Sequence, residues 1–204
     1  SPNQPQLIFG NIIHRVLDSF HGTKEDLTED KIIKILNKEW KTVEFEYSIR
    51  KEEFKEQAIA MLKRYANAVS REKPDVLLTE HEFFFDIDTV RIRGKIDRID
   101  IGTSGKNIID YKTNKRSSPA KESIQLAIYC LYFEQMEEGP LKGIPESATL
   151  YFLRDEQQPA QSHSFTKPEL NTTRDKIEEV AQSIRASNFE PIKGYHCDWC
   201  DYKD

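Results

Sequence analysis

Hydrophobic residues recur with a helical period over the first third of the chain. One stripe contains Phe9, Ile12, Ile13, Val16, Leu17 and Phe20. Residues 29–40 and 50–70 show the same period, which indicates amphipathic helices. The third segment ends before Pro74, which disfavours a helical residue directly in front of it. The pattern predicts three helices that form one helical layer over residues 7–70.

From Val76 to Thr113 the hydrophobic period changes to two, which is typical of β-strands. Residues 148–154 and 162–165 show short runs of the same kind and are expected to extend the sheet. Two further helices are predicted between and after these strands. Ser118 and Pro119 are expected to cap a helix that runs to about Met136. Thr166 and Glu169 match a capping box at the start of a helix that runs to about residue 186.

The order of these elements predicts an α/β fold, with a central mixed β-sheet flanked by helices and an N-terminal helical layer. No long flexible linker interrupts the chain, so residues 1–204 are expected to form a single domain. Its parts would be the helical layer at 7–70, the α/β core at 76–190 and a cysteine-containing segment at 191–204.

The composition is that of a folded globular protein, because 37% of the 204 residues are hydrophobic. No apolar run approaches the length of a membrane-spanning helix, and the first residues do not resemble a secretion signal. We therefore expect no membrane partner. Three cysteines are an odd number for a disulfide framework, so a reducing compartment, the cytoplasm, is expected.

The net charge of −5 argues at first against a nucleic-acid partner. The charge is unevenly distributed, however. Residues 91–121 contain nine basic and three acidic side chains, a local charge of +6, which leaves −11 for the remainder. The average therefore conceals a basic segment on an acidic body, and a basic segment suits a polyanionic substrate such as DNA.

The middle of this basic segment predicts a pair of facing carboxylates. If residues 102–105 form the turn of an antiparallel hairpin, Asp97 lies opposite Asp110 with the two Cβ atoms about 5 Å apart. Lys112 follows Asp110 by two residues and should lie on the same face of the sheet. Like charges so close are unfavourable unless a cation lies between them, and Mg²⁺ prefers carboxylate oxygens.

Spacing alone leaves a second interpretation open, in which the carboxylates lie on a solvated face and Lys112 forms a surface ion pair with Asp110. One detail favours the metal site. Apolar residues Ile96 and Ile99 are three positions apart instead of two, which predicts a β-bulge beside Asp97. Bulges are over-represented next to active sites.

Four segments resemble the PD-(D/E)XK nuclease superfamily and, more closely, its RecB-like branch. Residues 94–100 (GKIDRID) and 110–113 (DYKT) resemble its catalytic hairpin, and residues 10–14 (GNIIH) resemble its N-terminal helix with a metal-binding histidine. Residues 125–129 (QLAIY) resemble its QxxxY motif. The resemblance implies a restriction-endonuclease-like core. It also implies a metal-dependent DNA nuclease, for which an exonuclease activity is expected over an endonuclease activity. The implied role is the processing of DNA ends in recombinational repair, with a helicase as partner.

The resemblance implies a role for each matching residue. The metal ligands would be His14, Asp97, Asp110 and the backbone carbonyl of Tyr111. Lys112 would place or activate the attacking water and stabilise the charge that develops on phosphorus. The cation would be Mg²⁺ or Mn²⁺, and the imidazole ligand suits Mn²⁺ well.

Four further residues have weaker assignments. Gln125 and Tyr129 lie one helical turn apart and would support the site or contact the DNA backbone, as in the family; ordinary helix packing is the alternative. Glu80 resembles an acid on the strand before the hairpin that would support the ligands. Asp18, one turn after His14, would either hold its second ring nitrogen or be solvated.

Cys197 and Cys200 resemble part of the four-cysteine iron–sulfur staple of many RecB-like nucleases. The chain lacks the first and last cysteines of that pattern, so a [4Fe–4S] cluster is expected only in the intact protein, from which this domain would be excised. A zinc site with His196 lacks an evident fourth ligand. Cys130 is expected to be a buried small apolar residue.

Two competing functions stay open at this point. The chain could be a non-catalytic DNA-binding or scaffold domain of a helicase complex, or a structural domain whose acid pair is accidental. The complete set of Asp97, Asp110 and Lys112 favours the nuclease, because an inactivated copy is expected to lose at least one of them.

Overall fold

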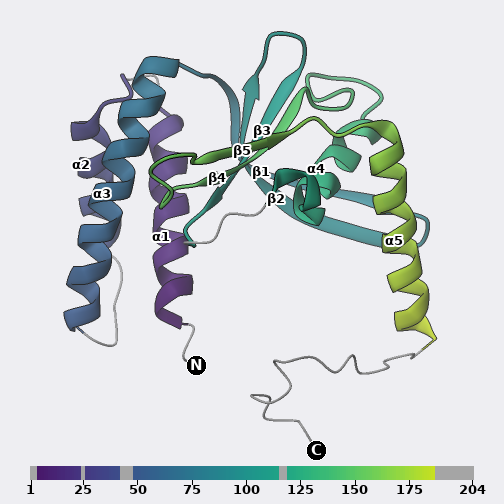
Figure 1. Cartoon of the computed structure of the whole chain (residues 1–204), viewed down its shortest axis with the longest axis horizontal. Helices are drawn as coiled ribbons and strands as arrows, with labels where there is room; N and C mark the ends of the chain where they lie inside the picture. The colour runs from purple at the N-terminus through teal and green to yellow at the C-terminus, as the bar shows by residue number, and fades with distance from the viewer. Residues whose placement is uncertain (1–3, 24–25, 42–47, 115–118, 187–204) are drawn as a thin grey trace, which may run out of the picture.

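The fold is described from a computed structural model, for residues 4–23, 26–41, 48–114 and 119–186. Figure 1 shows a β-sheet with one group of helices on each side. The helices are α1 (Gln4–His21), α2 (Glu29–Lys41), α3 (Ser48–Glu72), the 3₁₀ turn η1 (Ala120–Glu122), α4 (Ile124–Gln135) and α5 (Lys167–Arg185). The strands are β1 (Asp75–Ile87), β2 (Val90–Ile101), β3 (Lys106–Lys112), β4 (Ser147–Phe152) and β5 (Ala160–His163).

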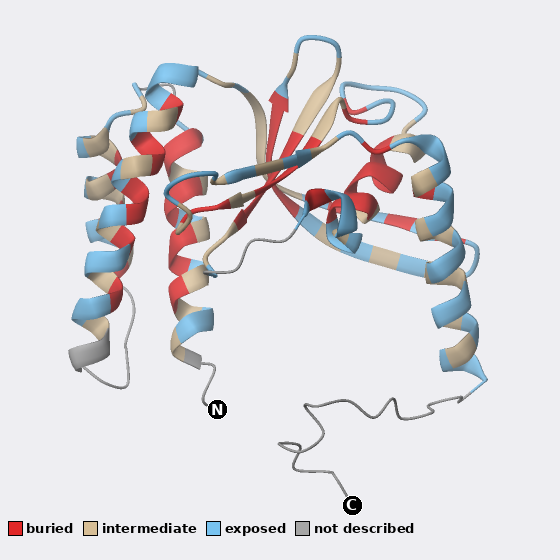
Figure 2. Ribbon diagram, in the orientation of Figure 1, coloured by how far each residue is buried: buried red, intermediate tan, exposed pale blue. Residues whose placement is uncertain are grey.

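The three N-terminal helices form the predicted helical layer. The apolar stripe of α1 is buried, with Ile12 and Phe20 fully inaccessible to solvent, and it packs with residues of α2 and α3 such as Leu36 and Leu62. Figure 2 shows the buried residues of these helices turned toward one another and toward the sheet. The helical period of the sequence therefore predicts this layer correctly.

The sheet has the strand order β1-β2-β3-β4-β5. Neighbouring strands are antiparallel except β3 and β4, which are parallel. The connection from β3 to β4 passes through η1 and α4, as a parallel pair requires a crossover. Helices α4 and α5 pack with a second apolar cluster that includes Phe83, Ile96 and Leu150. The predicted α/β class with a mixed sheet and flanking helices is confirmed.

The predicted hairpin has the expected register. The Gly102 amide donates to the Gly105 carbonyl at 2.8 Å, and the β2–β3 ladder runs from the pair Ile101–Lys106 to the pair Arg98–Ile109. One more step in the same register brings Asp97 to the level of Asp110. The turn residues and the alternation of the strands were therefore sufficient to place the two carboxylates.

The predicted bulge beside Asp97 is wrong. The β1–β2 register shifts between Val76 and Leu78, which pair with Asp100 and Ile99. The pairs Thr79–Arg98 and His81–Ile96, which flank Asp97, have the same β1–β2 register, so no residue is inserted between them. The local distortion there is on the neighbouring strand, where Glu80 has a φ of 49°. Backbone strain in β1, not an extra residue in β2, therefore accompanies the irregular spacing of Ile96 and Ile99.

The start of α4 also differs from the prediction. Pro119 is extended and precedes the 3₁₀ turn, and α4 begins only at Ile124. Ser123 is the N-cap, and its hydroxyl accepts from the Leu126 amide at 3.3 Å. Ser118, the predicted cap, lies outside the described residues. The capping box of Thr166 and Glu169 at the start of α5 is confirmed.

Among the residues that the structure describes, no helix is long and apolar enough to span a membrane. The C-terminal segment with His196, Cys197 and Cys200 lies outside the described residues, so the assignments made for it stay predictions. Cys130 is 1% exposed, as expected for a small apolar core residue, and burial raises the pKa of its thiol to about 12.

Candidate active site

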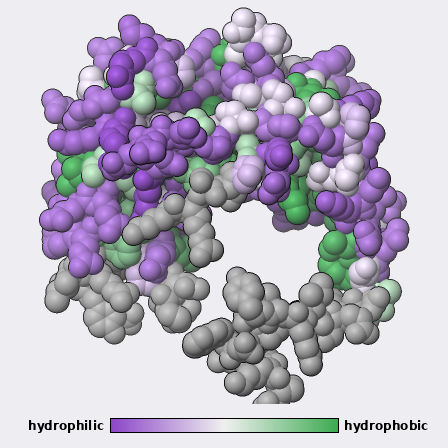
Figure 3. Space-filling model, in the orientation of Figure 1, coloured by the Kyte–Doolittle hydropathy of each residue, from purple (hydrophilic) through white to green (hydrophobic). Residues whose placement is uncertain are grey.

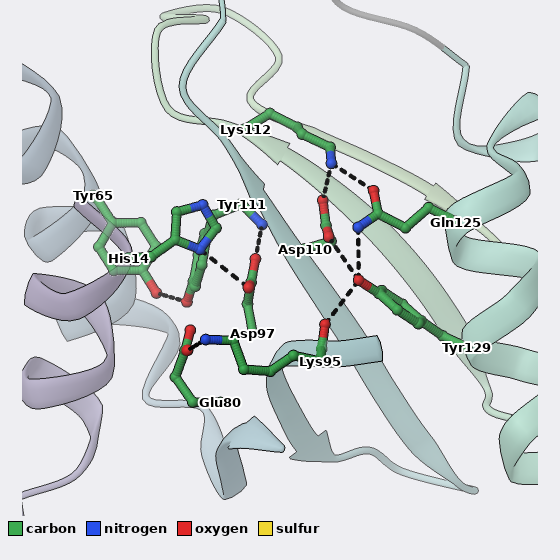
Figure 4. A network of polar contacts seen from close by, with 10 residues as sticks. All are labelled: His14, Tyr65, Glu80, Lys95, Asp97, Asp110, Tyr111, Lys112, Gln125 and Tyr129. Carbon is green, nitrogen blue, oxygen red and sulfur yellow. Dashed lines mark hydrogen bonds and ion pairs between the residues drawn. The ribbon is translucent and has the colours of Figure 1, made fainter. Parts of the chain in front are cut away.

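A pocket of about 350 Å³ lies where β2 and β3 meet the first turns of α4 and the middle of α1. It is lined by His14, Lys95, Asp97, Asp110, Tyr111, Lys112, Thr113, Asn114, Gln125 and Tyr129. Every metal ligand and catalytic residue expected from the sequence is in this set. Figure 4 shows that these side chains approach from two directions, with His14 on one side of the carboxylates and Gln125 and Tyr129 on the other.

Asp97 is bound from the side of α1. Its Oδ1 lies 3.1 Å from His14 Nδ1, and its Oδ2 accepts from the backbone amide of Tyr111 at 2.7 Å. Burial alone would lower the pKa of His14, but the hydrogen bond to Asp97 and the negative charges nearby outweigh it and raise the pKa. The negative charge of Asp97 therefore favours the protonated form of the His14 imidazole.

Asp110 is bound from the side of α4. It is 2% exposed, and its Oδ2 lies 2.6 Å from Lys112 Nζ. Burial and the charge of Asp97 raise the pKa of Asp110 despite the ion pair with Lys112. The two carboxylates thus repel each other inside the protein, and a cation between them would relieve that repulsion.

A hydrogen-bonded chain connects Lys112 to α4. Lys112 Nζ donates to Gln125 Oε1 at 2.7 Å, and Gln125 Nε2 donates to the Tyr129 hydroxyl at 2.7 Å. The Tyr129 hydroxyl lies 2.9 Å from the Lys95 carbonyl oxygen and 3.2 Å from Asp110 Oδ1, which share its single proton. The one-turn spacing of Gln125 and Tyr129 therefore holds both the lysine and the second carboxylate in place.

The interpretation as a solvated surface is wrong, because Asp97 and Asp110 are 7% and 2% exposed. Its expectation that Lys112 pairs with Asp110 is correct. The proposed contact between Asp18 and His14 is not formed: Asp18 Oδ1 accepts from the Thr79 hydroxyl at 2.6 Å. The side chain of Asp18 instead links α1 to β1.

Comparison with known proteins gives one decisive match. A profile described as the PD-(D/E)XK nuclease superfamily matches residues 1–204, the whole chain. The chain belongs to this superfamily. Its members are typically metal-dependent nucleases, and the mixed five-stranded sheet with flanking helices agrees with their restriction-endonuclease-like fold.

Two other comparisons add no information on the function. A solved structure titled "Crystal structure of SSO0001" is 18% identical, covers 73% of this chain and 74% of its own, and superposes with a TM-score of 0.39. A search of curated proteins returned no match. The assignment to the PD-(D/E)XK nuclease superfamily therefore depends on the profile and on the geometry of the pocket.

The structure adds Glu80 to the potential ligands of this PD-(D/E)XK site. One ligand atom each from His14, Glu80 and Asp97 lies within 4.8 Å of the others. The sequence predicts only a supporting role for Glu80. Because His81 pairs with Ile96, the β1–β2 register places Glu80 next to Asp97, but this register is not evident from the sequence.

Lys95 is a pocket residue that was not predicted from the sequence. It forms an ion pair with Glu80, which together with the charge of Asp97 raises its pKa despite partial burial. Its position two residues before Asp97 on the same strand was the available signal, since alternate residues share a face.

The residues present suit a divalent cation of the kind that PD-(D/E)XK nucleases use. Carboxylate oxygens are preferred by Mg²⁺ and Mn²⁺, and imidazole is accepted by Mn²⁺. Asp97, Glu80 and His14 provide such donors within one group, and Asp110 lies across the same pocket. Burial and the charge of Asp97 raise the pKa of Asp110, and a cation in the pocket would favour its ionised form.

Proposed function

We propose that this chain is the nuclease domain of a RecB-like protein that hydrolyses phosphodiester bonds in DNA with the help of Mg²⁺ or Mn²⁺. The observation that carries the proposal is the convergence of Asp97, Asp110 and Lys112, with both acids buried, in one pocket. Buried acids of like charge are costly unless they are neutralised, so their presence together points to a cation.

In this proposal His14, Asp97, Asp110 and the backbone carbonyl of Tyr111 would hold the cation. A bound cation would polarise the scissile phosphate and lower the pKa of the attacking water. Asp97 is already oriented for this role, because its two oxygens are held by His14 and by the Tyr111 amide. His14 would bind in its neutral form and therefore lose its proton on metal binding.

Lys112 would provide the positive charge that stabilises the oxygens of the phosphate during attack. Its ammonium lies in the pocket, where it forms an ion pair with Asp110 and donates a hydrogen bond to Gln125. Gln125 and Tyr129 would position Lys112 and Asp110 without contacting the reacting atoms, because their polar groups are already bound to each other and to these two residues.

Several finer features belong to the same proposal. We propose an exonuclease that acts on DNA ends during recombinational repair, with a helicase on the same longer chain or in the same complex. The similarity of Cys197 and Cys200 to half of an iron–sulfur staple supports a [4Fe–4S] cluster in the intact protein. A DNA-processing role agrees with a location in the cytoplasm.

The test is cleavage of end-labelled linear DNA with Mg²⁺ or Mn²⁺. We expect Asp110→Ala and Lys112→Ala each to reduce the rate at least about a hundredfold, since each removes a charge from the reacting centre. The matched controls Asp175→Ala and Lys176→Ala change exposed residues of α5 and should cleave like the unchanged chain. Cleavage that survives both active-site substitutions would contradict the site assignment.

Two further readouts separate the finer claims. Calorimetric titration with Mn²⁺ should show weaker binding for His14→Ala than for His163→Ala, whose imidazole lies on β5. Circular DNA should resist an exonuclease and be cut by an endonuclease. If a longer chain with all four cysteines binds DNA but cuts neither substrate, the scaffold function replaces the nuclease.

A further inference from the structure

The β1–β2 hairpin has one face that none of the core clusters covers. This outer ribbon face consists of Glu82, Phe84 and Asp86 on β1 and Arg91, Arg93 and Lys95 on β2, all exposed. Figure 1 shows the hairpin extending from the sheet away from α1, α2 and α3, and Figure 2 shows exposed residues along it. The opposite face, with Phe83 and Phe85, is buried in the cluster with α4.

The residues of the outer ribbon face form three pairs across the strands. Phe84 and Arg93 form the central pair. On one side, Asp86 accepts two hydrogen bonds from Arg91, each at 2.9 Å. On the other side, Lys95 lies opposite Glu82 and forms an ion pair with Glu80, which is outside this face. Arg93 forms no ion pair or side-chain hydrogen bond within the described part of the chain, so its charge is available to an anion.

Phe84 is the one exposed phenylalanine among the described residues, with 65% of its surface accessible. The view in Figure 3 shows a largely hydrophilic surface on which hydrophobic residues form small separate patches. The guanidinium carbon of Arg91 lies 5.3 Å from the centre of the Phe84 ring, so a flat cation adjoins the ring. An aromatic face next to basic side chains is the arrangement on which unpaired bases stack.

The outer ribbon face leads to the active site. Arg91, Arg93, Lys95 and Asp97 are alternate residues of one strand, and Arg93 lies about 13 Å along β2 from Asp97 by strand geometry. Lys95 lines both the catalytic pocket and a second pocket of about 830 Å³ that includes Phe84, Arg91 and Arg93. Figure 4 shows Lys95 beneath Asp97 at this junction. A ligand on the outer ribbon face would therefore reach the buried carboxylates.

We propose that the outer ribbon face binds a single strand of DNA and guides it into the active site, with one base stacked on Phe84 and a phosphate bound by Arg93. This inference rests on the proposed nuclease function and specifies single-stranded DNA as its substrate. A single strand is favoured over a duplex because the bases of a duplex are already stacked on each other and do not offer a face to Phe84.

The test measures binding of a fluorescent single-stranded oligonucleotide by anisotropy, with EDTA present so that no cleavage occurs. Phe84→Ala and Phe84→Leu should each weaken binding about tenfold, because both remove the ring on which a base stacks. Phe84→Trp should keep or improve binding. The matched control is Val180→Ala on α5, which is 58% exposed and should bind like the unchanged chain.

The salt dependence separates the two contacts. One lost phosphate contact reduces the slope of log K against log salt by about 0.7 for a single strand. Arg93→Ala should therefore flatten the slope by this amount, whereas Phe84→Ala should weaken binding with the slope unchanged. Lys142→Ala, at an exposed loop residue, should leave both affinity and slope unchanged.

Each outcome decides between the proposals. Unchanged affinity in Phe84→Ala and Arg93→Ala overturns the binding surface, even if the chain cleaves DNA. A stronger effect of these variants on duplex binding also overturns it, in favour of a hairpin that enters the major groove. Binding that depends on Phe84 in a chain that does not cleave with any metal retains the surface and rejects the nuclease. The melting temperature of each variant shows whether the fold is retained.

Discussion

The two halves of β2 differ sharply although they are one continuous strand. Residues 96–100 are buried on both faces of the sheet, whereas residues 90–95 alternate between partly buried and exposed. The inner half contains Asp97, Arg98 and Asp100, three charged side chains that are each no more than 7% exposed. The outer half contains charged residues that face solvent. The same residue types therefore serve different purposes in the two halves.

In the inner half, charges hold the active site in shape. Arg98 donates to Asp100 at 2.7 Å, to the Tyr65 hydroxyl at 2.6 Å and to the Tyr111 hydroxyl at 3.1 Å. Burial raises the pKa of Tyr111 to about 12, so its phenol stays neutral. Because the backbone amide of Tyr111 binds Asp97, this network fixes the residue next to the proposed metal ligand.

The largest difference between the halves should appear when an arginine is removed from each. Arg98→Met leaves Asp100 buried without its partner and should lower the free energy of unfolding by about 3–5 kcal/mol, measured by urea titration. Arg91→Met in the outer half removes an exposed ion pair and should leave the urea midpoint unchanged within error. Equal losses in the two variants would show that burial does not distinguish the halves.

Gly94 lies at the boundary between the two halves of β2. Its replacement by alanine adds one methyl group at this boundary. A Cβ at this position would lie 2.5 Å from Phe83 Cζ, and the Phe83 ring is stacked on Tyr132 with the centroids 4.8 Å apart. Gly94→Ala should therefore destabilise the chain by about 1–3 kcal/mol through overpacking, again measured with urea. Double replacement with Phe83→Leu should restore part of the loss. A neutral Gly94→Ala would mean that the ring moves freely.

A pH series gives the smallest expected effect. His21 lies 3.2 Å from Arg98 Nη1, and burial together with the charges of Arg98 and Lys31 lowers its pKa to about 3. The unfolded chain takes up a proton near pH 6.5 while the folded chain does not, so stability falls as the pH decreases below that value. From pH 7 to 5.5 this loss should be about 1 kcal/mol.

His21→Gln is the control for the pH series, because it keeps a polar side chain that does not titrate. Between pH 7 and pH 5.5, the unfolding free energy of the unchanged chain should therefore fall by about 1 kcal/mol more than that of the variant. Parallel curves for the two chains across this range would show that His21 does not contribute to the acid sensitivity.

Local patterns predicted the features that depend on neighbouring residues. The turn at Gly102–Gly105 and strand alternation were sufficient for the register that brings Asp97 opposite Asp110. The start of α4 was predicted too early, because Ser118 and Pro119 have the pattern of a helix start, whereas Pro119 is extended and Ser123 is the N-cap of α4. The residue at which α4 begins thus depends on the path of the loop before it, which one local pattern does not specify.

The partners of single side chains could not be predicted in the same way. Asp18 binds Thr79, and Glu80 lies next to His14 and Asp97. Both contacts depend on the position at which α1 packs along β1 and β2. Asp18 and Thr79 are 61 positions apart, and Glu80 is 66 positions from His14. Sequence spacing carries no information on such contacts, since they depend on the packing of a helix on a sheet.

The order of helices and strands, the facing carboxylates and the residue types that can bind a divalent cation could all be predicted from local sequence patterns. These follow from period, turn residues and alternation, which act over a few residues. Three features required the folded structure: the burial of the carboxylates, the approach of Glu80 and Lys95 to them, and the exposure of Phe84 and Arg93 on the same two strands. Burial depends on which elements cover which face, and that is a property of the packed molecule.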